Sequence, residues 1–330
     1  MRPPSHRPEL SVSVGLWQDR PADEVLVTAA AADELGFAEL WLGEMATFDA
    51  FALGAVIAGR TARIALTIGP LAVAVRDPAM IAMGVATLTE LTGRGVRVAL
   101  GSSSPVVVQQ WHGREQRRTA LALAESAGAV RTLLDGGRAD VDGEVISTHG
   151  YRVRTAPPRS ELTIAAFGPG AVRVAAHVAD RMVLNLVTPT AAGQLVDQLR
   201  TEADAVGRPM PRVAAWVATA VDPSPTAAEQ LRRGLVGYLA APGYGEMFAA
   251  AGFGELVAFA RTFPPPRELL GAIPPEAVAA VCAAGDVATV LARLDEYGAV
   301  GVDQIALVPA SVDEDPGGVA TLAALADGGT

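Results

Sequence analysis

The sequence predicts a (β/α)₈ barrel, and three observations indicate it. Eight short apolar segments typical of strands alternate with helix-like segments along the chain, which favours a parallel sheet wrapped in helices. Half of the 330 residues are hydrophobic, enough to fill one large core. No G-x-G-x-x-G motif follows the first strand, which counts against the alternative, a doubly wound dinucleotide-binding sheet.

The predicted strands share a composition rich in Val, Ile, Leu and Ala. They are residues 11–16, 38–42, 63–75, 96–101, 162–167, 181–186, 212–221 and 302–309. Helical patterns follow the first six strands at 21–35, 49–60, 77–91, 115–135, 169–179 and 190–205. A longer helical region follows the seventh strand and a C-terminal helix follows the last, which completes eight units.

Two segments depart from a minimal barrel. Residues 136–158 are rich in turn formers and predict an excursion with short strands. Residues 222–275 are Ala-rich and interrupted by prolines, which predicts a helical insertion between the last two strands. Loops after barrel strands surround the active site, so we interpret this insertion as a lid. We expect one domain over residues 1–330.

Composition excludes several chemistries. The chain has no lysine, which excludes Schiff-base catalysis and a Walker-type phosphate lysine. The single cysteine, Cys282, rules out a disulfide framework and lies in a helical pattern as a small buried residue. The four histidines are scattered, so we expect no metal site.

Charge and hydropathy limit the partners. The net charge of −10 is dispersed and no basic stripe appears, so we expect no nucleic-acid partner. Apolar runs are shorter than the roughly 20 residues that span a bilayer, and "MRPPSHRPEL" lacks a signal-peptide core. We therefore expect a cytoplasmic protein without membrane contact, acting on a small-molecule substrate.

Small and hydroxyl-bearing residues gather where strands end. Gly69-Pro70 interrupts the third strand, where Pro cannot donate to a ladder and Gly suits a bulge. "GSSSP" offers the hydroxyls of residues 102–104, and "AFGPGAVRV" turns into a helix N-terminus that suits a phosphate. Together they indicate a phosphorylated cofactor that carries the chemistry. Glu44 is the only acid close after a strand.

Three stretches carry a resemblance: "AADELGFAELWLGEM", "RTARIALTIGPLAVAVRDPAMIAMGVATLTELTGRGVRVALGSSSPVVVQQWHGR" and "LTIAAFGPGAVRVAAHVADRMVLNLVTP". They resemble the bacterial-luciferase-like superfamily, and within it the actinobacterial oxidoreductases that use the deazaflavin coenzyme F420. The resemblance spans residues 11–310. It implies a luciferase-like barrel with the cofactor ring in its C-terminal mouth, and a homodimer.

The resemblance also assigns roles. It implies a cis peptide bond at Gly69-Pro70, in a bulge that backs the ring. In the dehydrogenase branch an acid and a histidine end the second strand, whereas this chain has Glu44 and Met45. The branch's catalytic glutamate falls on Ser104. Both departures place dehydrogenation by that mechanism in doubt and leave Glu44 as the tentative catalytic residue, a structural hydrogen bond being its alternative.

We therefore expect an F420-dependent oxidoreductase that transfers a hydride between the deazaflavin and a small or medium organic substrate. The expected cofactor-binding residues are Gly69, Pro70, Ser102, Ser103, Ser104, Val106, Val107, Phe167, Gly168, Pro169 and Gly170. The expected pocket residues are Trp17, Met45, Trp111, His112 and Trp216. The alternatives are an FMN-dependent monooxygenase with a separate reductase, and a non-catalytic cofactor-binding protein. Arginines 76, 114, 117 and 118 would favour F420, whose tail is acidic.

Overall fold

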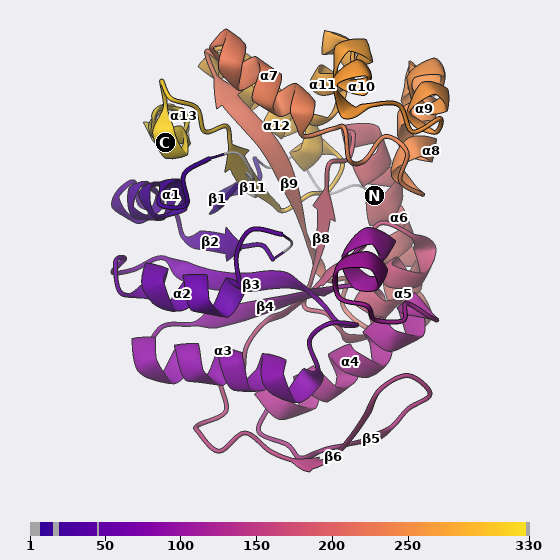
Figure 1. Ribbon diagram of the computed structural model, residues 1–330. Coiled ribbons are helices and arrows are strands. Elements are labelled where there is room, and N and C mark those ends of the chain that lie inside the picture. The colour runs from indigo at the N-terminus through magenta and orange to yellow at the C-terminus, as the bar shows by residue number, and fades with distance from the viewer. Residues whose placement is uncertain (1–6, 16–19, 45, 328–330) are drawn as a thin grey trace.

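Eight parallel strands close into a barrel in the computed structural model, which describes residues 7–15, 20–44 and 46–327 (Figure 1). Around the barrel, each strand pairs with the next and β8 returns to β9. The strands in barrel order are β9 (Arg212–Val221), β11 (Gln304–Pro309), β1 (Glu9–Ser13), β2 (Glu39–Leu42), β3 (Ala65–Ala72), β4 (Val96–Gly101), β7 (Leu162–Ala165) and β8 (Arg181–Asn185). The predicted (β/α)₈ barrel is confirmed.

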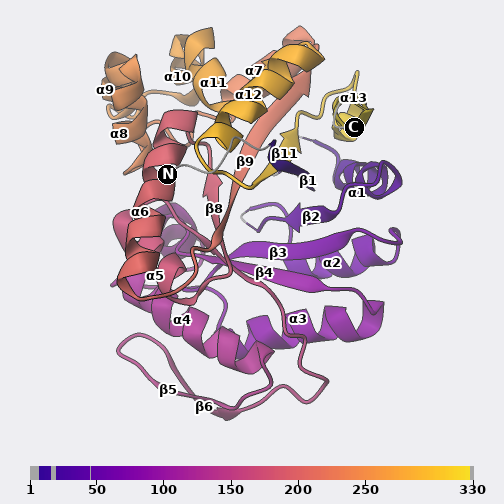
Figure 2. The ribbon, with the colours of Figure 1, turned by 180° about the vertical axis from the view of Figure 1, so that it is seen from behind.

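Helices cover the outside of the barrel on all sides, as Figures 1 and 2 show. The helices that follow strands are α1 (Glu24–Glu34), α2 (Ala50–Ala58), α3 (Pro78–Thr92), α4 (Thr119–Leu134), α5 (Pro169–Val178), α6 (Pro189–Ala205), α12 (Val287–Ala299) and α13 (Val319–Asp327). Helix α4 begins four residues later than the pattern predicts, because Arg118 has a left-handed φ of +48°.

Two excursions leave this frame. The strands β5 (Ala139–Asp142) and β6 (Ser147–Tyr151) form an antiparallel hairpin within the predicted excursion 136–158. The insertion after β9 contains α7 (Pro225–Arg233), α8 (Tyr244–Phe248), α9 (Gly254–Ala260), α10 (Pro266–Ala272) and α11 (Pro275–Val281). It extends beyond the predicted end at residue 275, and β10 (Ala283–Gly285) then pairs with the end of β9. Figure 1 places α8 and α9 on the opposite side of the molecule from the hairpin.

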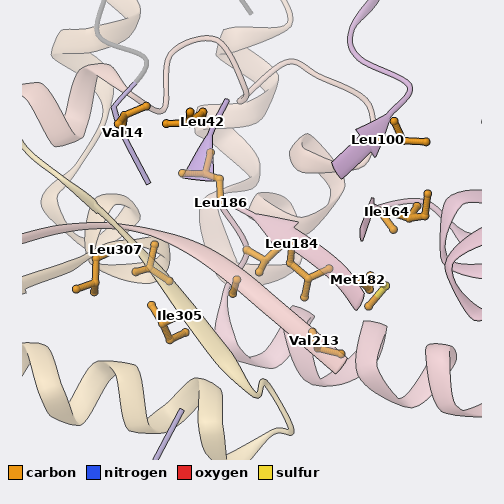
Figure 3. Packing of buried hydrophobic residues seen from close by; sticks show 14 of the residues in the cluster. Val14, Leu42, Leu100, Ile164, Met182, Leu184, Leu186, Val213, Ile305 and Leu307 are labelled. Carbon is orange, nitrogen blue, oxygen red and sulfur yellow. The ribbon is translucent and has the colours of Figure 1, made fainter. Parts of the chain in front are cut away.

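Strand alternation divides the buried residues into two sets. Leu and Ile side chains that point outward pack between the strands and the helices, as Figure 3 shows for Leu42, Leu100, Leu184 and Leu307. Residues that point inward fill the barrel itself. Cys282 ends α11 and is buried, as predicted, and its burial raises the pKa of its thiol to about 12.

The lower half of the barrel interior, toward the N-terminal ends of the strands, is a charged cluster around Arg181. This side chain is 1% exposed. Its Nη1 donates to Glu39 Oε2 and Gln304 Oε1 at 2.8 Å each, and its Nε donates to Thr163 Oγ1 at 3.1 Å. Burial alone would raise the pKa of Glu39, but Arg181, Arg97 and Thr67 hold it at about 2. We call this cluster around Arg181 the charged floor; it fills the end of the barrel where the strands begin.

Candidate functional site

A layer of two indoles lies directly above the charged floor. The guanidinium of Arg181 stacks on Trp41, with its Cζ 4.3 Å from the ring centroid. Trp41 meets Trp216 edge-on, with centroids 5.9 Å apart at 82°. Both indole Nε1 atoms are buried without a hydrogen-bond partner within the described ranges. Two buried donors without acceptors at mid-barrel are unusual, because such groups are normally satisfied.

Above this layer the barrel is open to solvent. Inward-facing residues next along the strands are only partly buried, although the closed barrel surrounds them. They are mostly small: Pro70, Ala165, Asn185, Ala218 and Val308. A Cβ added at Gly101 would lie 3.4 Å from Ala165 and 3.5 Å from Pro70, ordinary contact distances. The C-terminal mouth is therefore a hollow with an apolar wall.

The Gly69-Pro70 bond is cis, as the resemblance implies. The register between β3 and β4 shifts between Ile68 and Leu71, so the pair sits in a bulge. Gly69 has a φ of +112°, and a Cβ there would lie 2.2 Å from the carbonyl oxygen of Ala99. Only glycine allows this close approach of two strands.

The serine segment after β4 has a fixed backbone. Ser103 takes a left-handed φ of +58°, uncommon outside glycine and frequent at functional sites. Gln116 Nε2 holds the loop by donating to the carbonyl oxygens of Ser102 and Ser103 at 3.0 and 3.1 Å. The hydroxyl of Ser104 accepts from the Val107 N–H at 3.3 Å, at the start of a π-helix over Val106–Trp111. Val106 is exposed there and Val107 is buried.

The segment 167–170 enters α5 as predicted. Gly168 is the N-cap and Pro169 the first helical residue, and both are exposed. A Cβ on Gly170 would lie 2.9 Å from that of Ala120, so packing against α4 requires glycine there. The helix starts at a strand end, and helix N-termini in this position suit an anion. Its first residue, Pro169, has no N–H, and the Ala171 N–H donates to the Gly168 carbonyl oxygen at 3.1 Å, so the Gly170 N–H is the one that an anion would use.

Glu44 lies just beyond β2 and is tied to Arg76. Arg76 Nε and Nη2 donate to the two oxygens of Glu44 at 2.7 and 2.6 Å. The N–H of Ala50, at the start of α2, donates to Glu44 Oε2 at 3.0 Å. Arg76 also pairs with Asp49. Strand alternation turns Leu42 toward the helices, and the hydrogen bond from Ala50 holds Glu44 at the start of α2.

The predicted pocket residues are dispersed. Trp17 and Met45 lie outside the described residues. Trp111 is 52% exposed at the end of the π-helix, and His112 beside it is also exposed. Trp216 belongs to the indole layer and lies at the bottom of the hollow, above the charged floor.

A polar and aromatic cluster at the hollow was not predicted. Phe167 stacks on Tyr244 with centroids 4.3 Å apart, and Tyr244 meets Tyr238 edge-on at 4.9 Å. Asn185 Nδ2, at the end of β8, donates to the Tyr238 hydroxyl at 3.3 Å. The insertion supplies both tyrosines, more than 50 residues along the chain from Asn185, where no short-range pattern points to the strand end.

A second space lies beside Ser102. It is a cavity of about 430 Å³ between the loop after β3, the segment that precedes α4 and the tip of the hairpin. Arg76, Arg114 and Arg117 line it. Arg76 holds Glu44 and Asp49, Arg117 holds Glu115, and Arg118 holds Glu144. Arg114 alone of the four has no carboxylate partner in the described part of the chain.

Among the described residues, no group of three or more His, Cys, Asp or Glu side chains is arranged to hold a metal ion. No helix in the same ranges is long and apolar enough to cross a membrane.

Comparison with known proteins places these features in context. The family model for luciferase-like monooxygenases matches residues 3–304. A Mycobacterium tuberculosis protein, assigned provisionally to the coenzyme F420-dependent oxidoreductases, is 27% identical over 199 residues. The alignment covers 56% of this chain and 57% of that relative, which is less than two thirds of its length.

Solved structures agree on the fold. The coenzyme F420-dependent tetrahydromethanopterin reductase of Methanopyrus kandleri superposes with a TM-score of 0.82 at 19% identity, covering 96% of this chain and 97% of that one. The oxygenating constituent of 3,6-diketocamphane monooxygenase from Pseudomonas putida, in complex with FMN, superposes with a TM-score of 0.72 at 14% identity, covering 97% of each. At such identities the likeness establishes the barrel alone.

Proposed function

The chain belongs to the luciferase-like monooxygenase family, and from this premise we propose that it is an F420-dependent oxidoreductase of a small or medium organic substrate. The observation that carries the proposal is the open upper barrel. Gly101, Pro70, Ala165 and Ala218 make much of its wall small, so a flat ring can approach the backbone there. A hollow of this kind, beside the N-terminus of α5, fits a phosphorylated tricyclic cofactor.

The residues present fit such a group. Gly69 and Pro70 would back the ring, with Ser102, Ser103 and Ser104 at its edge and Val106 and Val107 beyond them. Phe167, Gly168, Pro169 and Gly170 would hold the phosphate and the chain that leads to it. Trp216, with its unpartnered indole N–H, would form the floor. When bound, the deazaflavin supplies a hydride equivalent.

The substrate side favours reduction by the reduced cofactor. Glu44, the acid closest to the mouth by sequence, already accepts three hydrogen bonds from Arg76 and Ala50. This engagement favours the structural alternative for Glu44 over proton relay. With Glu44 engaged in this way, the protein's part in this proposal is to bind, orient and shield the substrate. We accordingly propose substrates that accept a hydride, such as unsaturated carbonyl or nitro compounds.

Of the four arginines expected to favour the acidic tail of F420, only one has a charge that no carboxylate of the described residues neutralises. Three of the four are neutralised by carboxylates, which leaves Arg114 beside the 430 Å³ cavity as the cation that would meet an acidic cofactor tail. FMN lacks such a tail and would need only the ring and phosphate positions. FMN use is the alternative, because a structural neighbour binds FMN on the same barrel.

A parallel titration with F420 and FMN tests the proposal. We expect F420 to bind with a Kd in the micromolar range or below, and to bind more weakly as salt screens Arg114. Arg114→Ala should reduce that salt dependence, whereas the carboxylate-paired Arg118→Ala should not. If the protein binds FMN but not F420, the FMN-dependent monooxygenase replaces the F420-dependent oxidoreductase as the proposed function. Binding of F420 without turnover of any unsaturated carbonyl or nitro acceptor would favour a non-catalytic protein.

We also propose a homodimer. On α3, Met80, Met83 and Leu91 lie on one face and are 43–80% exposed, and Val56 on the neighbouring helix α2 is 48% exposed. Exposed apolar residues on one helix face support the proposal of an interface there. Light scattering should give twice the chain mass of 33.9 kDa, and Met83→Glu should return it to one. A monomeric wild-type protein would contradict the dimer.

A further inference from the structure

Asn185, Tyr238 and Tyr244 form one unit at the rim of the hollow. Asn185 is the third inward-facing residue of β8 after Arg181 and Val183, so its side chain points into the barrel above the indole layer. The two tyrosines come from the insertion and cover the end of β8. All three are partly exposed. Solvent therefore reaches part of each of these residues, and they are not sealed in the core.

The direction of the hydrogen bonds sets what this unit can bind. The Asn185 amide donates to the Tyr238 hydroxyl at 3.3 Å, and the Tyr244 ring contacts the Tyr238 ring. The Tyr238 oxygen is thereby used as an acceptor, and it keeps its own proton to donate. Within the described residues, neither hydroxyl donates to a protein acceptor. Two neighbouring O–H donors are left for a group from outside.

Aromatic packing fixes the positions of both donors. Tyr244 is held between Phe167 and Tyr238 by ring contacts at 4.3 and 4.9 Å. Gly243 precedes it with a φ of +83°, and a Cβ there would lie 2.9 Å from the Phe167 ring. The backbone thus passes directly over Phe167, and a side chain at position 243 would push the tyrosine away.

We propose that the Tyr238 and Tyr244 hydroxyls are a paired donor site for an oxygen of the substrate that carries or develops negative charge, such as that of a carbonyl, enolate or nitro group. The inference rests on the proposed function, because it assigns the polar end of the same substrate pocket. Preorganised donors of this kind stabilise charge that appears on oxygen during reduction.

The electrostatics of the cluster suit donation. Burial raises the pKa of both phenols, against the smaller opposing influence of Asn185, so they remain protonated at neutral pH. The phenols cannot serve as bases there. No carboxylate or arginine contacts them among the described residues, so an anionic oxygen would meet donors without a competing charge.

The test uses the cofactor-free protein and 4-nitrophenolate, a small oxyanion whose visible absorption band shifts when its oxygen accepts hydrogen bonds. The probe is titrated into the wild-type protein and the variants Tyr238→Phe, Tyr244→Phe and the double variant. Tyr151→Phe, in the distant β6, is the matched control. Melting temperatures confirm that each variant folds.

We expect the probe to bind the wild type with a shifted band, each single variant to lose about tenfold in affinity, and the double variant to lose the band shift. Tyr151→Phe should match the wild type. Equal binding by all proteins, an unshifted band, or no binding to the wild type would each overturn the donor pair. Because no F420 is present, failure of F420 binding is seen separately, in its own titration.

Discussion

The lower and upper halves of the barrel interior are built by the same strands, yet they treat polar groups in opposite ways. In the lower half, Arg181 and Glu39 are almost completely buried, and their hydrogen-bonding groups meet protein partners. In the upper half, the Tyr238 hydroxyl accepts from Asn185 and donates to no acceptor in the described part of the chain, and the indole N–H of Trp216 likewise finds no acceptor there.

The difference indicates that the lower half of the barrel interior stabilises the fold, whereas the upper half is suited to binding a ligand. A buried charge network is tolerated only when its members satisfy one another. Unassigned donors and small side chains cost stability, so they persist where a ligand completes them. In β8, Arg181, Val183 and Asn185 are alternate residues, so the change occurs within a single strand.

Breaking the lower half should have the largest effect. Glu39→Gln removes the fully buried counter-charge of the Arg181 guanidinium and leaves it only the partly exposed Glu161, 3.0 Å from its Nε. We expect a loss of about 3 kcal/mol in the free energy of unfolding. The control is Glu9→Gln, which removes an exposed pair with Arg212 and should cost below about 1 kcal/mol. Urea titrations of both variants give the comparison, and equal losses would contradict it.

The same pair predicts a pH dependence. The pKa of Glu39 falls from its ordinary 4.5 to about 2 on folding, so its contribution is complete above about pH 4.5 and is lost as the pH falls toward 2. Urea midpoints measured across this range should therefore fall more steeply for the wild type than for Glu39→Gln. Parallel curves would assign the acid sensitivity to other carboxyl groups.

A side chain at the boundary between the halves should have an intermediate effect. Gly69→Ala places a Cβ against the Ala99 carbonyl at a φ of +112°, and we expect a loss of about 3 kcal/mol together with weaker cofactor binding. Gly36→Ala is the control, because Gly36 has a φ of +84° but nothing within 4 Å of its added Cβ. It should cost about 1 kcal/mol. Similar losses would mean that the strand contact is unimportant.

The smallest effect on stability should come from Glu44→Gln at the rim. Gln can still accept from Arg76, which keeps Asp49, so we expect a loss of about 1 kcal/mol and F420 affinity within a few-fold. A structural Glu44 leaves the turnover rate unchanged, whereas a proton relay would lower it by roughly 10²-fold. Glu115→Gln, in the exposed pair with Arg117, is the control.

The strands were predictable because apolar runs buried on both faces stand out between polar helices. The eight observed strands lie within two residues of most predicted bounds, and β3 ends earlier, at Ala72. The charged floor was visible in the sequence as polar residues at the starts of strands, but an active site is expected only where barrel strands end. Glu39, Arg181 and Gln304 each open a strand, which marks the closed end of the barrel rather than the mouth.

The candidate site was predictable only in part. The cis Gly69-Pro70 bond followed from the resemblance and is confirmed. The roles of the remaining predicted residues stay predictions. The tyrosine pair could not be foreseen, because its positions depend on how the insertion folds back over β7 and β8. The arginine partners of Glu44, Glu115 and Glu144 likewise come from loops whose paths local propensity does not determine.

The buried position of Cys282 has a practical consequence for spectroscopy. Its thiol, with a pKa of about 12 and no solvent access, is a poor target for maleimide reagents, and the chain has no lysine side chain to compete. A cysteine introduced at Phe263, which is 84% exposed on the insertion, would become the single reactive position. A fluorophore attached there would report the distance between the insertion and the tryptophans of the barrel. The native cysteine would not have to be removed first.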